Sequence, residues 1–127
     1  MGFLDNIFGS TNSSNESNFD WRNLLSIEQL EAIEEDSKTK PILIFKHSTR
    51  CSISRMALKQ FEREFTLQDK VTPYFLDLIA NRDVSNDIAS RFNVMHQSPQ
   101  LLVIKDGKSI YNASHSDINA EKIAEFV

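Results

Sequence analysis

The chain has 127 residues, of which 40% are hydrophobic and 25% charged, with a formal net charge of -4 and an isoelectric point near 5.3. This length and composition predict one compact domain, and the acidic balance gives no global attraction to nucleic acid or to an anionic membrane. A single cysteine excludes an internal disulfide. Because a secretory apolar core and a run of 18 or more apolar residues are both absent, we expect a cytoplasmic protein without stable membrane association.

The first 18 residues differ in composition from the rest of the chain. The stretch "MGFLDNIFG" is followed by "STNSSNESN", which is polar, rich in Ser and Asn, and without periodicity. We therefore predict a flexible N-terminal tail over residues 1–18 and one folded domain over residues 19–127.

Helical and strand patterns alternate along the first half of that domain. Residues 19–24 can add a short first strand, and Ser26, with Gln29 three residues later, is a good N-cap for a helix in "SIEQLEAIEEDSK". The apolar run "ILIF" after Pro41 predicts a central strand. From Cys51 to about Thr66, apolar residues recur every four positions and predict a helix that buries one face. That face consists of Ile53, Ala57, Phe61 and Phe65.

The second half continues the alternation and ends in a hairpin. The stretch "VTPYFLDLI" predicts a strand, and Asp83 is expected to cap a helix that buries Val84, Ile88 and Phe92. Two β-rich runs flank Asp106-Gly107, a dipeptide suited to a tight hairpin turn. A final helix is expected in "DINAEKIAEFV", with the polar residues 114–117 as its cap. Helical crossovers make the first strands parallel, and the hairpin is antiparallel, so the order predicts a mixed sheet.

Three short motifs carry a family resemblance. The stretches "WRNLLSIEQL", "KHSTRCSIS" and "HQSPQ", in this order of elements, resemble the YtxJ-like family of monothiol bacilliredoxins. The resemblance implies a thioredoxin-like α/β fold, with a mixed central sheet flanked by helices and a C-terminal β-hairpin and helix. It also implies thiol–disulfide exchange with the small thiol bacillithiol as co-substrate, and thiolated client proteins as partners. Many members carry Pro directly after the cysteine, where this chain has Ser52.

The candidate nucleophile is Cys51, at the start of the predicted helix. Unpaired backbone N–H groups and the positive end of the helix dipole favour the thiolate there. Lys46, Thr49 and Arg50 precede it closely and are candidates for binding the small thiol. Lys46 and Arg50 can equally be solvated surface charges.

The position of a second redox cysteine is occupied by Ser54, which we assign to the catalytic site. Its hydroxyl can donate a hydrogen bond to the thiolate, or Ser54 can simply be a good first-turn residue. Without a second thiol in the chain, a thiol from outside has to release whatever binds Cys51. The resemblance implies a cis peptide at Ser98-Pro99, with the backbone of Ser98 pairing with an extended client segment.

The sequence leaves two other functions open. A binding protein like the monothiol glutaredoxins could hold an iron–sulfur cluster between two chains, although the Cys-Gly-Phe-Ser motif of those proteins is absent. A thioredoxin-like adaptor would carry its thiol incidentally. The single Cys and three dispersed His residues lack zinc-like spacing, so we expect no metal site, no tightly bound cofactor and a monomer.

Overall fold

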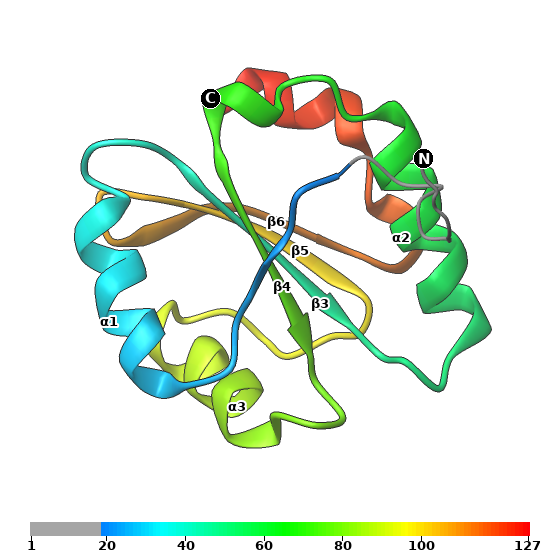
Figure 1. Ribbon diagram of the computed structural model, residues 1–127, viewed down its shortest axis with the longest axis horizontal. Helices are drawn as coiled ribbons and strands as arrows, with labels where there is room; N and C mark the ends of the chain where they lie inside the picture. The colour runs from blue at the N-terminus through cyan, green and yellow to red at the C-terminus, as the bar shows by residue number, and fades with distance from the viewer. Residues whose placement is uncertain (1–18) are drawn as a thin grey trace, which may run out of the picture.

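A five-stranded mixed sheet forms the centre of the molecule in the computed structural model, which describes residues 19–127 (Figure 1). Its strands, in the spatial order β2-β4-β3-β5-β6, are β2 (Arg22–Asn23), β4 (Thr72–Asp77), β3 (Ile42–His47), β5 (Gln100–Lys105) and β6 (Lys108–Ser114). The first three are mutually parallel, whereas β5 is antiparallel to both β3 and β6. The predicted mixed sheet and its terminal hairpin are therefore confirmed. The predictions for residues 1–18 lie outside the described residues.

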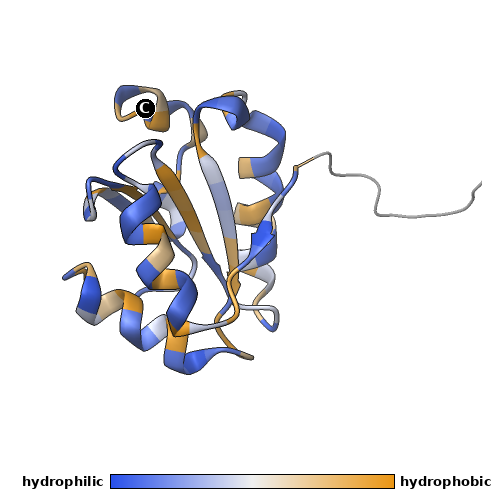
Figure 2. Cartoon of the chain, turned by 60° about the vertical axis from the view of Figure 1, so that its left-hand side comes forward, coloured by the Kyte–Doolittle hydropathy of each residue, from blue (hydrophilic) through white to orange (hydrophobic). Residues whose placement is uncertain are grey.

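Helices cover both faces of this sheet. The chain forms α1 (Ile27–Asp36), α2 (Ser52–Glu64) and α3 (Arg82–Arg91), with the short 3-10 helices η2 (Gln68–Lys70), η3 (His115–Asp117) and η4 (Ala120–Glu125). In Figure 1, α1 and α3 lie on one side of the sheet, and α2 lies on the other with the C-terminal segment. The apolar stripes of the helices face the sheet (Figure 2), as their periodicity predicts.

The two faces of β3 belong to two different hydrophobic clusters. Ile42 and Ile44 pack with residues of α1 and α3, whereas Leu43 and Phe45 pack with residues of α2 and η4. The strand is central, as predicted from "ILIF", but it continues through Lys46 and His47, and all six of its residues are buried. These two polar side chains are tolerated because each has a buried polar partner, Gln100 for Lys46 and Ser54 for His47.

Local sequence signals are confirmed at two turns. Ser26 and Gln29 form the predicted capping box. The peptide before Pro99 is cis, as the family resemblance implies. Asp106 and Gly107 both have positive φ, of 54° and 76°, as a type I′ hairpin turn requires. The hairpin tip is fastened to the end of α1, because Gly107 N–H donates to Ser37 Oγ at 2.8 Å.

Two local predictions are wrong, and both concern helix caps. The N-cap of α3 is Asn81, and Asp83 lies within the first turn. The expected final helix is confirmed as the 3-10 helix η4, but its cap is Asn119, whose side chain accepts from Glu121 N–H. The polar residues 114–117 do not cap it, because they form their own short turn as η3.

The buried face predicted for α2 is also shorter than expected. Phe61 and Phe65 are buried, but Ile53 is 63% exposed. In the first turn of α2, Ser54 faces the sheet and is buried, whereas Ile53 borders an open groove beside η3.

Candidate functional site

Cys51 is the N-cap residue of α2, in an extended conformation with φ -110° and ψ 121°. Its side chain is half-buried and makes no capping hydrogen bond. The loop that leads into it is tightened by a bond of 3.2 Å from Cys51 N–H to Ser48 C=O. The first turn of α2 holds no acidic residue, so no carboxylate there opposes the positive end of the helix dipole. The thiol thus lies at a helix N-terminus, where solvent can reach it.

Ser54 is fully buried and fastens the cysteine loop to the helix. Its hydroxyl oxygen accepts from Ser48 N–H at 3.1 Å and lies 2.8 Å from His47 Nδ1. If Nδ1 is unprotonated, the single hydroxyl proton of Ser54 is donated to it. If Nδ1 carries a proton, Nδ1–H donates and the hydroxyl proton is free for another acceptor. Because no hydrogen bond among residues 19–127 joins Ser54 to Cys51, donation from Ser54 to the thiolate stays a prediction.

His47 is a candidate site residue that the sequence analysis did not single out. It is 4% exposed at the end of β3, and its ring centroid lies 5.4 Å from that of Phe75. Burial lowers the pKa of His47, Asp77 opposes this by raising it, and Arg55 lowers it further. The alternation along β3 could have revealed His47, because it shares a face with Phe45, toward α2.

Lys46 lies on the opposite face of β3 and has no accessible surface. Its ammonium donates to His96 Nδ1 at 2.8 Å and to Gln100 Oε1 at 3.1 Å. Burial lowers the pKa of Lys46 from 10.5 to about 8. The interpretation of Lys46 as a solvated surface charge is therefore wrong. Direct contact between Lys46 and a substrate stays a prediction.

The loop before Pro99 supplies the third part of the site. Ser98 is half-buried and Pro99 is buried. Pro99 C=O accepts from His115 N–H at 3.1 Å, whereas no backbone hydrogen bond among residues 19–127 uses the N–H or C=O of Ser98. An extended peptide could therefore pair with these free groups of Ser98.

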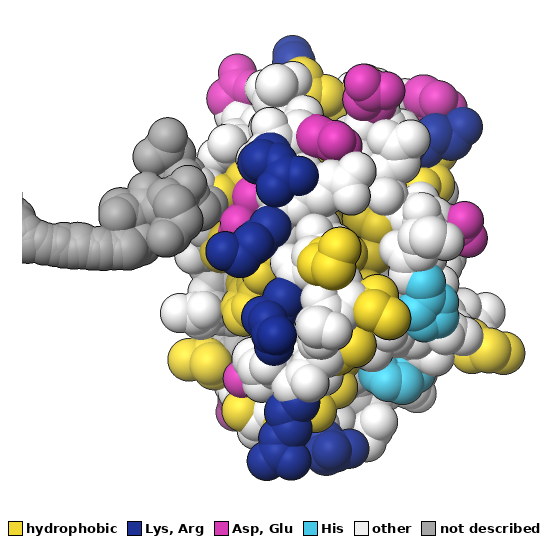
Figure 3. All heavy atoms as spheres, turned by 90° about the vertical axis from the view of Figure 1, so that its right-hand side faces the viewer, with side chains coloured by type: hydrophobic (Ala, Val, Ile, Leu, Met, Phe, Trp, Pro, Cys, Tyr) yellow, Lys and Arg dark blue, Asp and Glu magenta, His cyan; other side chains and the backbone are white. Residues whose placement is uncertain are grey.

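Thr49 and Arg50 are both exposed in the loop before Cys51. Further along, α2 exposes Arg55, Lys59 and Arg63 at a spacing of four residues, which places them on one face of the helix. Figure 3 shows Lys and Arg side chains in a row on this side of the molecule, with hydrophobic side chains beside them. An acidic protein thus carries a local basic surface next to its thiol.

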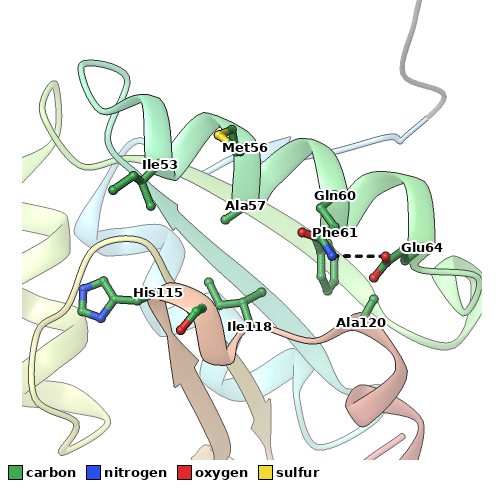
Figure 4. Close-up of a pocket in the computed structure, with 10 residues that line it drawn as sticks. Ile53, Met56, Ala57, Gln60, Phe61, Glu64, His115, Ile118 and Ala120 are labelled. Atoms are coloured by element: carbon green, nitrogen blue, oxygen red, sulfur yellow. Dashed lines mark hydrogen bonds between the residues drawn. The ribbon is translucent and has the colours of Figure 1, made fainter.

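An apolar groove of about 300 Å³ runs between α2 and η3. Ile53 and Ala57 face Ile118 across it (Figure 4). Ile53 and Met56 border the groove and are 63% and 70% exposed. Ile53, two residues after Cys51 in the chain, is the lining residue nearest to it in sequence.

Comparison with known proteins decides the family. The family described as monothiol bacilliredoxin BrxC matches residues 22–123. The chain belongs to this family. The match confirms the resemblance seen in the three sequence motifs and supports a thiol redox function.

Solved structures place this bacilliredoxin-family chain among thioredoxin folds. A structure described as a candidate oxidoreductase with a thioredoxin fold is 36% identical, with a TM-score of 0.70, over 81% of this chain and 89% of that chain. Thioredoxin of Malassezia sympodialis is 17% identical with a TM-score of 0.66, over 86% of this chain and 89% of its own. Thioredoxin of Fasciola hepatica is 23% identical with a TM-score of 0.62, over 82% and 93%. The two thioredoxins support the fold alone.

Residues 19–127 contain neither a cluster of metal-binding side chains nor a helix that could span a membrane. Within that range no three His, Cys, Asp or Glu residues gather where they could hold a metal ion. None of the helices there has the length and apolar character needed to cross a membrane.

Proposed function

We propose that the protein is a monothiol thiol–disulfide oxidoreductase that removes bacillithiol from client cysteines through a mixed disulfide on Cys51. The observation that carries the proposal is the half-buried thiol at the N-cap of α2, with Ser54 in place of a second cysteine. Family membership and the thioredoxin fold support the thiol chemistry. A reducing compartment such as the cytoplasm suits this cycle, because Cys51 has to return to the thiol.

The proposed cycle has two exchanges. In the first, the Cys51 thiolate attacks the bacillithiol sulfur of a client mixed disulfide. A disulfide forms between Cys51 and bacillithiol, the old S–S bond breaks, and the client leaves as a thiolate. In the second, the thiolate of another bacillithiol attacks the sulfur of the bound one and releases Cys51. The products are a reduced client and oxidised bacillithiol, so electrons balance.

The surroundings of Cys51 suggest where each partner binds. We assign the small thiol to the exposed side of the cysteine loop, at Thr49 and Arg50. The free backbone groups of Ser98 suit an extended client segment, and the groove beside Ile53 can take an apolar side chain of that client. Ser54 holds the loop through Ser48 and can supply a proton donor to the thiolate, as set by His47.

The test is to incubate the reduced protein with oxidised bacillithiol and to record its intact mass. We expect one adduct on the wild type, none on Cys51→Ala, and an unchanged adduct on Ser52→Ala, which alters an exposed residue of the same turn. Turnover of a client mixed disulfide by the wild type completes the test. A thiol that stays unmodified at neutral pH would contradict the proposal and favour an adaptor.

A further inference from the structure

A polar cluster around the buried side chain of Lys46 contacts the loop that leads to Ser98. Its centre is the ammonium of Lys46, which contacts His96 Nδ1 at 2.8 Å and Gln100 Oε1 at 3.1 Å. Ser85 of α3 adds a longer contact of 3.4 Å to the same nitrogen of His96. No ion pair within residues 19–127 includes Lys46. A fully buried ammonium is thus held by neutral acceptors alone.

The amide of Gln100 joins this ammonium to the loop. Lys46 and Gln100 face each other across β3 and β5, and Gln100 is 1% exposed. While Oε1 accepts from Lys46, it also accepts from Gln97 N–H at 3.4 Å, and Nε2 donates to Met95 C=O at 2.9 Å. The Lys46 bond fixes which end of the amide points at β3. It therefore also fixes where the backbone of Met95 and Gln97 is held.

We infer that Lys46 and Gln100 are positioning residues that set the geometry of Ser98 for pairing with a client segment. The inference rests on the proposed function, because it names the residues that make the client edge of that same site. Gln97 and Ser98 are adjacent, so a displacement of the Gln97 backbone also displaces the backbone of Ser98. A buried ammonium without a carboxylate partner is costly, and Met would fill similar space without the charge. The role that remains for the ammonium is the orientation of Gln100 and, through it, of the loop.

The test compares two substrates that carry the same bacillithiol disulfide. One is an extended synthetic peptide with the modified cysteine at its centre, and the other is free cysteine with the same modification. For Lys46→Met we expect the KM for the peptide to rise about five- to tenfold, because the pairing-competent loop is less populated. The values of kcat for the peptide and kcat/KM for modified cysteine should stay within about twofold of the wild-type values. The reason is that Cys51 begins α2, which packs on the other side of the sheet from Lys46.

A matched control is Lys105→Met, which removes one positive charge from an exposed position at the far end of β5. Gln100→Met should reproduce the effect of Lys46→Met, and the double variant should be no worse than either single one. An unchanged KM for the peptide would overturn the inference. An equal loss on both substrates would overturn it too, because it would place Lys46 in contact with the small thiol.

A second measurement does not depend on activity. Amide hydrogen exchange at Gln97, whose N–H donates to Gln100, should accelerate in Lys46→Met and not in Lys105→Met. If the wild type turns over neither substrate, the proposed function fails, and exchange at Gln97 alone decides the positioning role. Unchanged exchange at Gln97 refutes it.

Discussion

Replacing Lys46 by Met is expected to stabilise the protein at neutral pH while it weakens client binding. Burial holds the pKa of Lys46 at about 8 instead of 10.5, a difference of about 2.5 pH units. At about 1.36 kcal/mol for each unit, the buried charge costs about 3 kcal/mol of folding free energy at pH 7. The variant loses two hydrogen bonds, to His96 and Gln100, at about 1 kcal/mol each. The net expectation is a gain of about 1 kcal/mol in the free energy of unfolding.

The pH dependence separates this charge effect from better packing. Below pH 8 the lysine is charged in both states, so the wild type carries the full cost. Between pH 8 and 10.5 the folded state loses the proton and the unfolded state keeps it, so wild-type stability rises with pH. Lys46→Met lacks this rise of about 2 to 3 kcal/mol between pH 7 and pH 10, so its advantage of about 1 kcal/mol at pH 7 should turn into a deficit of about 1 to 2 kcal/mol at pH 10.

Urea unfolding at the two pH values measures the difference directly. The fluorescence of Trp21 is a suitable probe, because this residue packs in the aromatic cluster with Phe45 and Phe61. Other titrating groups are common to both proteins and cancel in the comparison. A stability difference between variant and wild type that does not change with pH would refute the reasoning.

Three more predictions concern the α2 side of the site. In Ser54→Ala, the free energy of unfolding measured with urea should fall by about 1 to 3 kcal/mol, because Ser48 N–H and His47 lose their buried partner. The control Ser52→Ala, at an exposed position, should change it by less than about 0.5 kcal/mol. Burial lowers the pKa of His47, so at acid pH the unfolded state binds more protons, and the wild type should lose stability as the pH falls through 6.5. His47→Asn should reduce this acid loss, and an equal loss in both proteins would contradict the assignment. Met56→Ser should raise the peptide KM without altering stability, since Met56 is 70% exposed, and an unchanged KM would remove the groove from the client site.

Features that depend on neighbours in sequence could be predicted. The capping box at Ser26, the hairpin turn at Asp106-Gly107 and the place of Cys51 at a helix start each follow from a few adjacent residues. The family motifs extended this to the fold and to the cis peptide before Pro99.

Features that depend on distant residues could not be predicted. The sequence allows Lys46 to be interpreted as a surface charge, because the two acceptors that hold its ammonium in the interior lie 50 and 54 positions away along the chain. Ile53 has the spacing of a core residue, yet it is 63% exposed and borders a groove whose other wall comes from residues of η3, more than 60 positions along the chain. Ser54 is close to His47 in sequence, but their contact depends on the turn at Ser48.

The adjacent residues Lys46 and His47 point to opposite sides of the sheet, and this has a consequence for engineering. His47 contacts the cysteine loop through Ser54, whereas Lys46 contacts the loop before Pro99 through Gln100. The proposed roles of Ser54 and Lys46 thus assign thiol reactivity and client preference to separate sets of side chains that share only one backbone strand. Libraries built on either side of β3 can be screened independently, and their best variants should combine additively.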